Sequence, residues 1–309
     1  MDLSIIIVSW NVRDLLAACL RSIQARPARA LAVEVIVVDS ASNDDTPHMV
    51  RDQFPDVVLM AQSENIGFTR GNNLGMAVAK GRHLLLLNPD TEVIADALEQ
   101  MTAHLDAHPQ VGIVGPHTLN TDGSTQSTRR RFPTLATALF ESTWLQGLAP
   151  RSVLERYYVA DATDDAEAVE VDWVQGSALM TRRAVYQQIG GLDEGYVMYS
   201  EEMDWCRRAK DAGWGVAYLG GARITHHGGK SSEQVTARRH IHFQQSKLRY
   251  FRKYHGALTA QGLRLFLLLN YAVQLALEAA KYLLGHKRDL RRERMRAYSQ
   301  VLASGLKVT

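Results

Sequence analysis

Residues 3–24, LSIIIVSWNVRDLLAACLRSIQ, decide the fold class, because a short apolar run is followed at once by a segment with helical spacing. The run LSIIIVS predicts a buried β-strand, and DLLAACLRSIQ places its apolar residues on one face of a helix. Three further apolar runs follow, each separated from the next by a helical segment. They are VEVIVVD from Val33, DVVLMA from Asp56 and RHLLLLN from Arg82. This alternation predicts an α/β fold with a mostly parallel sheet flanked by helices.

Polar side chains gather where the predicted strands end. They occupy four short stretches, Ser9 to Asn11, Asp39 to Asn43, Glu64 to Gly67 and Asn88 to Asp90. In an open α/β sheet, ligands bind outside the carboxyl ends of the parallel strands. No GxGxxG motif follows the first strand and no GxxxxGK[ST] motif occurs, which argues against dinucleotide binding and P-loop chemistry. The sequence therefore predicts a different kind of ligand site at this edge.

Composition and charge are those of a globular protein. The chain has 309 residues, of which 46% are hydrophobic and 22% charged, and its formal net charge is +2. The run from His286 to Arg296 alone carries six Lys or Arg against two acids, so we expect the catalytic body to be close to neutral. Cys19 and Cys206 lie far apart in helical patterns, which favours reduced thiols in a cytosolic compartment.

The second half of the chain has a less regular pattern. From Asn120 to Asp172 the periodicity weakens, which we interpret as a variable insertion. Residues 173–194 then predict a strand, a helix and a glycine-terminated turn, and residues 199–213 predict a helix that carries acids at its start. After about Gln234, the spacing of the apolar residues predicts helices.

The longest apolar stretch is GLRLFLLLNYAVQLALEAAKYLLG, residues 262–285. It is interrupted by polar residues, namely Arg264, Asn270, Gln274, Glu278 and Lys281. These interruptions and the basic run that follows favour an amphipathic helix in a membrane interface. The alternative is a helix in a dimer interface or in the protein core.

Asp39 ends the second predicted strand, where a carboxylate can accept the ring N–H of a pyrimidine base. A strand-end aspartate more often caps the next helix, but Asp44 and Asp45 lie nearer to that helix start. After the third strand, ENIGFTRGNN contains Gly67 and Gly71, which permit tight turns. Its polar side chains point to the same edge, namely Asn65, Arg70, Asn72 and Asn73.

Asp90 follows the buried fourth strand in LLLLNPD. A hard divalent cation prefers carboxylate and diphosphate oxygens, and one or two protein ligands suffice when the substrate supplies the rest. Asp90 can be such a ligand. The alternative, equally supported by the residue alone, is an Asx-type turn after Pro89.

A second acidic cluster, Glu201, Glu202 and Asp204, crowds the first turn of a predicted helix around Met203. Three neighbouring carboxylates exceed what helix capping needs, and their repulsion raises the pKa of at least one toward the range of a general base. Farther on, His226 and His227 precede two glycines. An imidazole there can complete a metal site or hydrogen bond to a phosphate, although loop histidines are often simply solvated.

Seven motifs in this order closely resemble those of the family 2 glycosyltransferases, particularly the rhamnosyltransferase-like branch. They are SIIIVSWN, VIVVDSASNDDT, ENIGFTRGNN, LLLLNPD, GGLDE, EEMDWCRRAKDAG and HHGGKSS, and the resemblance covers roughly residues 3–255. It implies a glycosyltransferase A-type (GT-A) fold, a nucleoside diphosphate sugar donor and Mg²⁺ or Mn²⁺ as cofactor. The implied parts are a nucleotide-sugar-binding half, 1–118, an acceptor-binding and catalytic half, 119–233, and a helical, membrane-associated region, 234–309.

The resemblance also assigns the donor side of the site. Asp39 is expected to contact the base, with Trp10 and Arg70 lining the nucleotide pocket, which Asn65 and Asn73 border. The family's DxD metal motif corresponds to Asn88-Pro89-Asp90, so Asn88 replaces its first acid and Asp90 is the main carboxylate. His226 matches the family's histidine near the metal and the diphosphate, and His227 is the alternative ligand.

The acidic segment is expected to carry the chemistry. EEMD resembles the family's acidic motif in which the second acid is the base, which indicates Glu202. Glu201 and Asp204 are expected to support it, and Arg208 to pair with them or with substrate. A single displacement inverts the anomeric centre, and because no QxxRW motif follows, we expect one sugar per binding event.

The branch resemblance implies dTDP-rhamnose as donor and a polyprenyl-diphosphate-linked sugar, N-acetylglucosamine, as acceptor. We expect a peripheral enzyme on the cytoplasmic face of the membrane, no nucleic-acid partner, and leave a homodimer open. The alternatives are a UDP-sugar donor or, given the incomplete DxD motif, a catalytically silent nucleotide-binding protein. A nucleotidyltransferase would need a basic, glycine-rich loop, which SWNVRDL lacks.

Overall fold

The computed structural model describes residues 1–25, 31–160, 168–228 and 236–307. The chain forms two compact units, each with its own interior. Unit 1 consists of Met1–Phe132, Tyr158–Glu194 and Glu201–Ser231, and unit 2 of Pro133–Tyr157, Gly195–Ser200 and Ser232–Thr309. The predicted boundaries after residues 118 and 233 stay a proposal.

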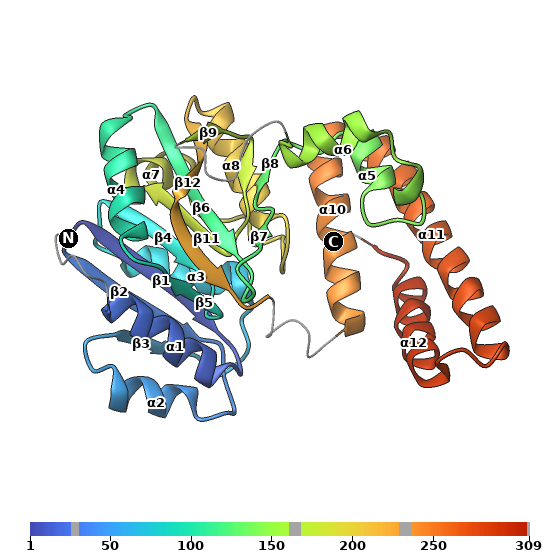
Figure 1. The fold of residues 1–309 in the computed structure, drawn as a ribbon, viewed down its shortest axis with the longest axis horizontal. Coiled ribbons are helices and arrows are strands. Elements are labelled where there is room, and N and C mark those ends of the chain that lie inside the picture. Colours follow the sequence, from blue (N-terminus) through green and yellow to red (C-terminus); the bar gives the residue numbers. More distant parts are fainter. Residues whose placement is uncertain (26–30, 161–167, 229–235, 308–309) are drawn as a thin grey trace. The chain divides into compact units, whose positions relative to one another are not determined.

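Unit 1 is built on a ten-stranded mixed sheet with the order β3-β2-β1-β4-β11-β6-β12-β5, to which β7 adds beside β6 and β9 beside β12 (Figure 1). Its strands are β1 (Leu3–Ser9), β2 (Val33–Asp39), β3 (Val58–Ala61), β4 (His83–Leu87), β5 (Thr91–Val93), β6 (Val111–Leu119), β7 (Thr125–Gln126), β9 (Val169–Glu170), β11 (Ala178–Arg182) and β12 (Gly215–His226). β8 (Arg129–Arg130) and β10 (Trp173–Val174) form a separate pair. Strands β1 to β4 are parallel to one another, which confirms the predicted α/β class, whereas β11 runs antiparallel between β4 and β6.

Helices cover both faces of this sheet. One face packs against α1 (Arg13–Gln24), α2 (Thr46–Gln53) and α4 (Ala97–Ala107), and the other against α3 (Phe68–Val78), α7 (Arg183–Ile189) and α8 (Glu201–Asp211). β1 and β4 are therefore buried on both sides, which explains why they are nearly continuous runs of isoleucine and leucine. Cys19 and Cys206 are both unpaired and buried, and burial raises the pKa of each thiol to about 12.

Gly67 and Gly71, both predicted to serve turns, have different roles. Gly67 has φ of 78° directly before α3, a conformation that favours glycine. Gly71 lies inside α3, where an added Cβ would come within 2.8 Å of a methyl group of Val8. The prediction of a turn at Gly71 is therefore wrong, because its small size instead allows α3 to pack closely on β1.

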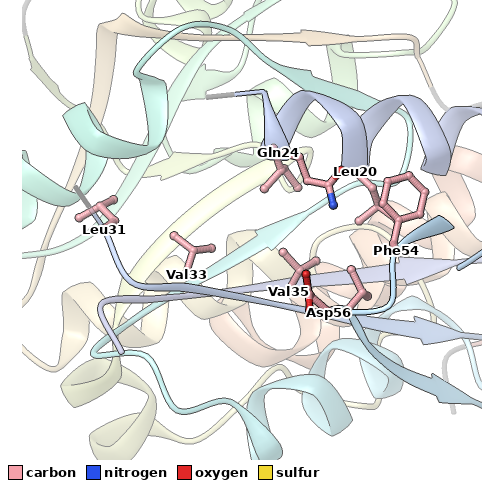
Figure 2. Close-up of a pocket in the computed structure, with 9 residues that line it drawn as sticks. Leu20, Gln24, Leu31, Val33, Val35, Phe54 and Asp56 are labelled. Carbon is pink, nitrogen blue, oxygen red and sulfur yellow. The ribbon is translucent and has the colours of Figure 1, made fainter. Parts of the chain in front are cut away.

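A cavity of about 430 Å³ lies at the amino end of β2 (Figure 2). It is lined by apolar side chains together with Gln24 of α1 and Asp56 before β3. The apolar side chains include Leu20 of α1, Val33 and Val35 of β2, and Phe54 after α2. This is the edge of the sheet opposite to the polar strand ends, so the cavity is separate from the predicted ligand site.

Unit 2 is helical. It contains α5 (Leu135–Phe140), a 3₁₀ turn η1 (Gln146–Leu148), most of α6 (Arg151–Tyr158), α10 (Thr236–His255), α11 (Ala257–Leu283) and α12 (Arg288–Ser304). α10, α11 and α12 pack on one another, and α5 packs on α11. A buried ion pair joins two of them, since Arg291 Nη1 of α12 lies 2.8 Å from Glu278 Oε2 of α11.

The two units differ strongly in charge. Unit 2 carries 17 Lys or Arg against 6 Asp or Glu, a formal charge of +11, and unit 1 carries 18 against 27, a formal charge of −9. The expectation of a nearly neutral catalytic body is therefore wrong. Basic residues are spread along unit 2 from residue 151 onward rather than confined to the run at 286–296.

Candidate active site

Asp90 and His226 lie side by side, although 136 positions separate them in the sequence. β5 starts at Thr91, directly after Asp90, and pairs with the end of β12, with Thr91 opposite His226. This pairing brings His226 Nε2 to 3.3 Å from Asp90 Oδ1. Both residues are buried, with 3% of Asp90 and 7% of His226 exposed.

Asn88 and His227 border this pair in different ways. Asn88 Nδ2 lies 3.5 Å from His226 Nε2, and its backbone N–H donates to the carbonyl of Ser177 at 2.9 Å. The ring of His227 is engaged elsewhere, with Nε2 at 2.7 Å from Glu92 Oε1. Of the two predicted histidines, the structure therefore brings His226 to Asp90.

Gln126 completes the surroundings of His226, and the sequence reasoning missed it. Its Oε1 lies 2.9 Å from His226 Nδ1, and its Nε2 donates to the His226 carbonyl at 2.8 Å. Gln126 lies on β7, which pairs with β6 after the TDGS turn. An Asp-Gly turn followed by an alternating polar segment is typical of a β-hairpin, so the sequence could have predicted this strand. It could not have predicted the contact between Gln126 and His226.

The site fits a divalent cation only if the substrate contributes ligands. No group of three or more His, Cys, Asp or Glu side chains suited to a metal occurs in the described part of the chain. Asp90 and His226 nevertheless present a carboxylate oxygen and an imidazole nitrogen to each other at 3.3 Å. Such a two-ligand arrangement suits Mg²⁺ or Mn²⁺ when diphosphate oxygens and water complete the shell.

Asp39 and Ser9 lie opposite each other at the carboxyl ends of β2 and β1. Asp39 Oδ2 accepts from the backbone N–H of Ser42 at 3.0 Å. Its Oδ1 and the Ser9 hydroxyl are buried and have no hydrogen-bond partner among the described residues. Buried polar atoms without partners are rare in folded proteins, so this pair is a candidate binding position. Ser9 was seen in the sequence only as one of several polar strand-end residues.

The other predicted nucleotide-side residues have varied surroundings. Asn65 Oδ1 accepts from Ser40 Oγ and from the N–H of Gly67, which joins the loops after β2 and β3. Asn73 Nδ2 donates to the carbonyl of Leu192, and Asn73 Oδ1 accepts from its N–H, so this side chain holds the loop after α7. Trp10 is half-buried at the end of β1, and Arg70 is exposed on α3.

The acidic cluster begins α8, and its three acids differ in environment. Helix α8 starts at Glu201 rather than at Met203. Glu201 is only 4% exposed, and its burial, together with the charge of Glu202, raises its pKa well above 4.5. Asp204 is fully buried and forms an ion pair with Arg208 at 2.9 Å.

The side chain of Arg208 contacts an acid of its own helix and two backbone carbonyls. Its Nη1 and Nη2 donate to the carbonyls of Ile189 and Gly191, each at 2.7 Å, in addition to the contact with Asp204. The guanidinium therefore ties α8 to the loop that follows α7. Arg208 was expected to pair with the neighbouring acids or with substrate, and the structure pairs it with Asp204.

Glu202 is half-buried and lies against the turn between β10 and β11. A Cβ added at Gly176 would be 3.6 Å from the Glu202 side chain. The next residue, Ser177, accepts the hydrogen bond from the N–H of Asn88. Glu202 is thus placed beside the segment that binds the backbone of Asn88, and both acidic motifs belong to unit 1.

The mixed α/β sheet flanked by helices is the fold of GT-A-type glycosyltransferases, and the acids and the histidine described above lie at one edge of it. Solved structures of this class are similar to the chain. A mannosyltransferase from Pyrobaculum calidifontis, in complex with GDP-Man and Mn²⁺, has a TM-score of 0.58 and 18% identity, over 99% of this chain and 86% of that one. GalNAc-T7 with UDP, GalNAc and Mn²⁺ has a TM-score of 0.57 and 17% identity, over 73% and 43%. At these identities the likeness shows the fold alone.

The chain belongs to glycosyl transferase family 2, whose model matches residues 4–190. Among its relatives is the N-acetylglucosaminyl-diphospho-decaprenol L-rhamnosyltransferase of Mycobacterium tuberculosis, 30% identical over 63% of this chain and 66% of the relative. The hexosyltransferase Agl10 of low-salt glycan biosynthesis in Haloferax volcanii is 27% identical over 68% and 62%. The rhamnosyltransferase WbbL of Escherichia coli is 25% identical over 52% and 61%. The chain thus spans about two thirds of the length of these relatives.

Proposed function

We propose that this protein is an inverting, metal-dependent glycosyltransferase that moves one L-rhamnose from dTDP-rhamnose to a polyprenyl-diphosphate-linked N-acetylglucosamine. Its product would enter cell-wall or surface polysaccharide. The observation that carries the proposal is the placement of Glu202 beside the segment that holds Asn88, with Asp90 and His226 adjacent. The name of the mycobacterial relative supports the sugar and the acceptor.

The donor's base is proposed to bind at Asp39. The buried Oδ1 of Asp39 can accept the ring N–H of thymine or uracil, and the Ser9 hydroxyl opposite it can accept or donate a further hydrogen bond. Trp10 and Arg70 stand at the ends of the neighbouring elements and would line the pocket. Asn65 and Asn73 would act through the loops that they hold.

The diphosphate is proposed to bind at the other end of the donor site, near Asn88, Asp90 and His226. Asp90 and His226 would hold Mg²⁺ or Mn²⁺, and the cation would neutralise the charge of the departing diphosphate. The Asn88 amide lies beside His226 and can donate where the first acid of the DxD motif would coordinate.

Glu202 is proposed to be the general base. Its carboxylate would take the proton of the acceptor hydroxyl, whose oxygen forms a bond to the anomeric carbon. The bond from that carbon to the diphosphate oxygen breaks, and its electron pair leaves with the nucleoside diphosphate. Burial keeps Glu201 in its neutral form to higher pH, which leaves the charge of the pair on Glu202.

Unit 2 is proposed to bind the membrane surface. It holds 11 of the 14 exposed large hydrophobic residues of the described chain, although it is the smaller unit. They are Leu135, Trp144, Leu148, Val197, Leu258, Leu265, Leu269, Leu277, Leu283, Leu284 and Leu290. An apolar surface of this kind with a charge of +11 suits an anionic lipid surface.

Helix α11 is proposed to lie in the interface rather than to span the bilayer. By length and composition it is the one described helix that can cross a membrane, with a mean hydropathy of 1.4. However, the buried pair of Glu278 and Arg291 fastens the arginine-rich α12 onto it. A spanning α11 would draw Arg292 and Arg294 toward the hydrocarbon, at about 2.5–3.5 kcal/mol for each arginine at the bilayer centre.

The test is a donor and acceptor screen with the full-length protein. dTDP-rhamnose, UDP-glucose and UDP-N-acetylglucosamine are incubated with Mn²⁺ or Mg²⁺ and polyprenyl-diphosphate-N-acetylglucosamine, and products are resolved by mass spectrometry and NMR. We expect transfer from dTDP-rhamnose with inverted anomeric configuration and loss of transfer with EDTA. Transfer only from a UDP-sugar would reject the donor, and no transfer from any donor would favour a silent nucleotide-binding protein.

A further inference from the structure

We propose that Gln126 is a positioning residue that sets which ring nitrogen of His226 faces Asp90. The inference rests on the metal-binding part of the proposed function, and it adds a residue outside the acidic and histidine motifs. Gln126 lies on β7, 100 positions before His226.

The two hydrogen bonds of Gln126 fix the orientation of its own amide. Nε2 donates to the His226 carbonyl at 2.8 Å, because a carbonyl oxygen can only accept. Oε1 is therefore the atom at 2.9 Å from His226 Nδ1, and since an amide oxygen only accepts, Nδ1 must carry the hydrogen. One side chain thus holds both the ring and the backbone of His226.

With Nδ1–H held by Gln126, Nε2 is the ring nitrogen that faces Asp90 Oδ1, 3.3 Å away. The amide nitrogen of Asn88 lies 3.5 Å from the same Nε2. Ligand histidines commonly donate their other N–H to a neighbouring oxygen, which fixes the tautomer and raises the basicity of the metal-bound nitrogen. Gln126 Oε1 provides that oxygen here.

The backbone contact adds a second restraint. His226 is the last residue of β12, and its carbonyl accepts a hydrogen bond from the Gln126 side chain. Gln126 itself is fixed by the pairing of β7 with β6, opposite Thr118. The hairpin at 119–126 therefore serves the metal site through one side chain.

The experiment measures Mn²⁺ binding directly, by electron paramagnetic resonance of free Mn²⁺ at one fixed pH. dTDP is present to supply the diphosphate oxygens, and a protein-free sample with dTDP is the blank. Gln126→Leu removes both hydrogen bonds, and we expect its Mn²⁺ dissociation constant to rise about 10–100-fold. Gln126→Glu keeps an acceptor for Nδ1–H but loses the N–H that binds the His226 carbonyl, so we expect a smaller loss of Mn²⁺ affinity than in Gln126→Leu. Gln187→Leu, on the exposed side of α7, is the matched control and should bind as wild type.

The outcomes separate this inference from the proposed function. Wild-type affinity in Gln126→Leu would overturn the positioning role, and so would equal losses in Gln126→Leu and Gln126→Glu, which would indicate packing alone. Lack of Mn²⁺ binding by the wild type with dTDP present would overturn the metal site itself and the inference with it. In histidine-labelled wild-type protein, ¹⁵N NMR should show His226 with its hydrogen on Nδ1, and the opposite tautomer would also contradict the inference.

Discussion

At the scale of single residues, Glu201 and Glu202 are adjacent in sequence but differ in surroundings. Glu201 points into the interior and is 4% exposed, whereas Glu202 is half-buried against Gly176. A glutamate that serves as general base must contact the substrate, and its carboxylate must be ionised to accept a proton. The more accessible of the two positions is the one that suits this role. The difference in burial therefore agrees with the proposed division of roles.

Glu202→Gln should abolish the base while preserving the shape of the side chain. We expect the rate of sugar transfer to fall about 10²–10⁴-fold, with little change in the affinity for the nucleoside diphosphate. Transfer is followed with radiolabelled donor, and nucleotide binding by calorimetry. Glu155→Gln, an exposed acid of α6, should transfer as wild type. A Glu202→Gln enzyme with undiminished transfer would rule out this base.

Glu201→Gln should change how stability depends on pH. Because burial and the charge of Glu202 raise the pKa of Glu201, the folded protein keeps a proton that the unfolded chain, with a pKa near 4.5, releases. The contribution of Glu201 to wild-type stability therefore falls as pH rises from that value to the folded pKa, by about 1.4 kcal/mol per pH unit. Glutamine removes this decline, so the Tm of the variant should gain on wild type across the window. Parallel Tm curves from pH 4 to 8 would contradict the assignment.

At the scale of elements, local patterns predicted the parallel strands in the first half of the fold because each strand and helix has its own apolar spacing. Each of β1 to β4 is a short apolar run followed by polar strand-end residues, and their parallel pairing agrees with the rules for alternating strands and helices. The position of β11 between β4 and β6 does not follow, because antiparallel insertion depends on contacts between distant segments. The same holds for β5 and β12, whose pairing places His226 at Asp90.

The site shows the same limit at the level of side chains. The resemblance indicated Glu202 and His226, but the sequence had no means to distinguish His226 from His227 without the contact between His227 and Glu92. Gln126 was hidden for a related reason, since its partner is 100 residues away. Two consecutive residues with positive φ, Tyr199 and Ser200, precede α8 and were also beyond prediction, because neither is glycine.

The α11–α12 pair offers a prediction at this scale. Arg291→Met leaves Glu278 buried without its closest cation, and we expect a loss of roughly 3 kcal/mol or less, below the usual range because Lys281 and Arg294 remain near. Replacing both members, Glu278→Leu with Arg291→Met, should restore most of the stability, since no buried charge remains. Chemical denaturation of the single and double variants measures the difference. A double variant less stable than Arg291→Met would contradict this account.

At the scale of the whole molecule, the excess of positive charge and most of the exposed large hydrophobic residues occur in the same unit. Unit 2 has a formal charge of +11 and unit 1 of −9, and 11 of the 14 exposed large hydrophobic residues lie in unit 2. Residues 133–157 contribute Leu135, Trp144 and Leu148 to this set, so the segment interpreted as a variable insertion shares the character of the C-terminal helices. An acidic body would be repelled by an anionic surface, which leaves unit 2 as the part suited to contact it.

Membrane binding by unit 2 can be tested in the full-length protein. We expect flotation with vesicles that contain phosphatidylglycerol, weaker flotation with pure phosphatidylcholine, and release by high salt, because the basic residues contribute electrostatically and the leucines by burial. Leu265→Asp with Leu269→Asp removes two exposed leucines of α11 and should weaken binding at least 10-fold, since each buried leucine contributes about 1.5–3 kcal/mol. Val58→Asp with Val78→Asp makes the same change on exposed positions of unit 1 and should bind as wild type. If the α11 pair floats as well as the unit 1 pair, α11 does not contact lipid and its apolar face has another partner.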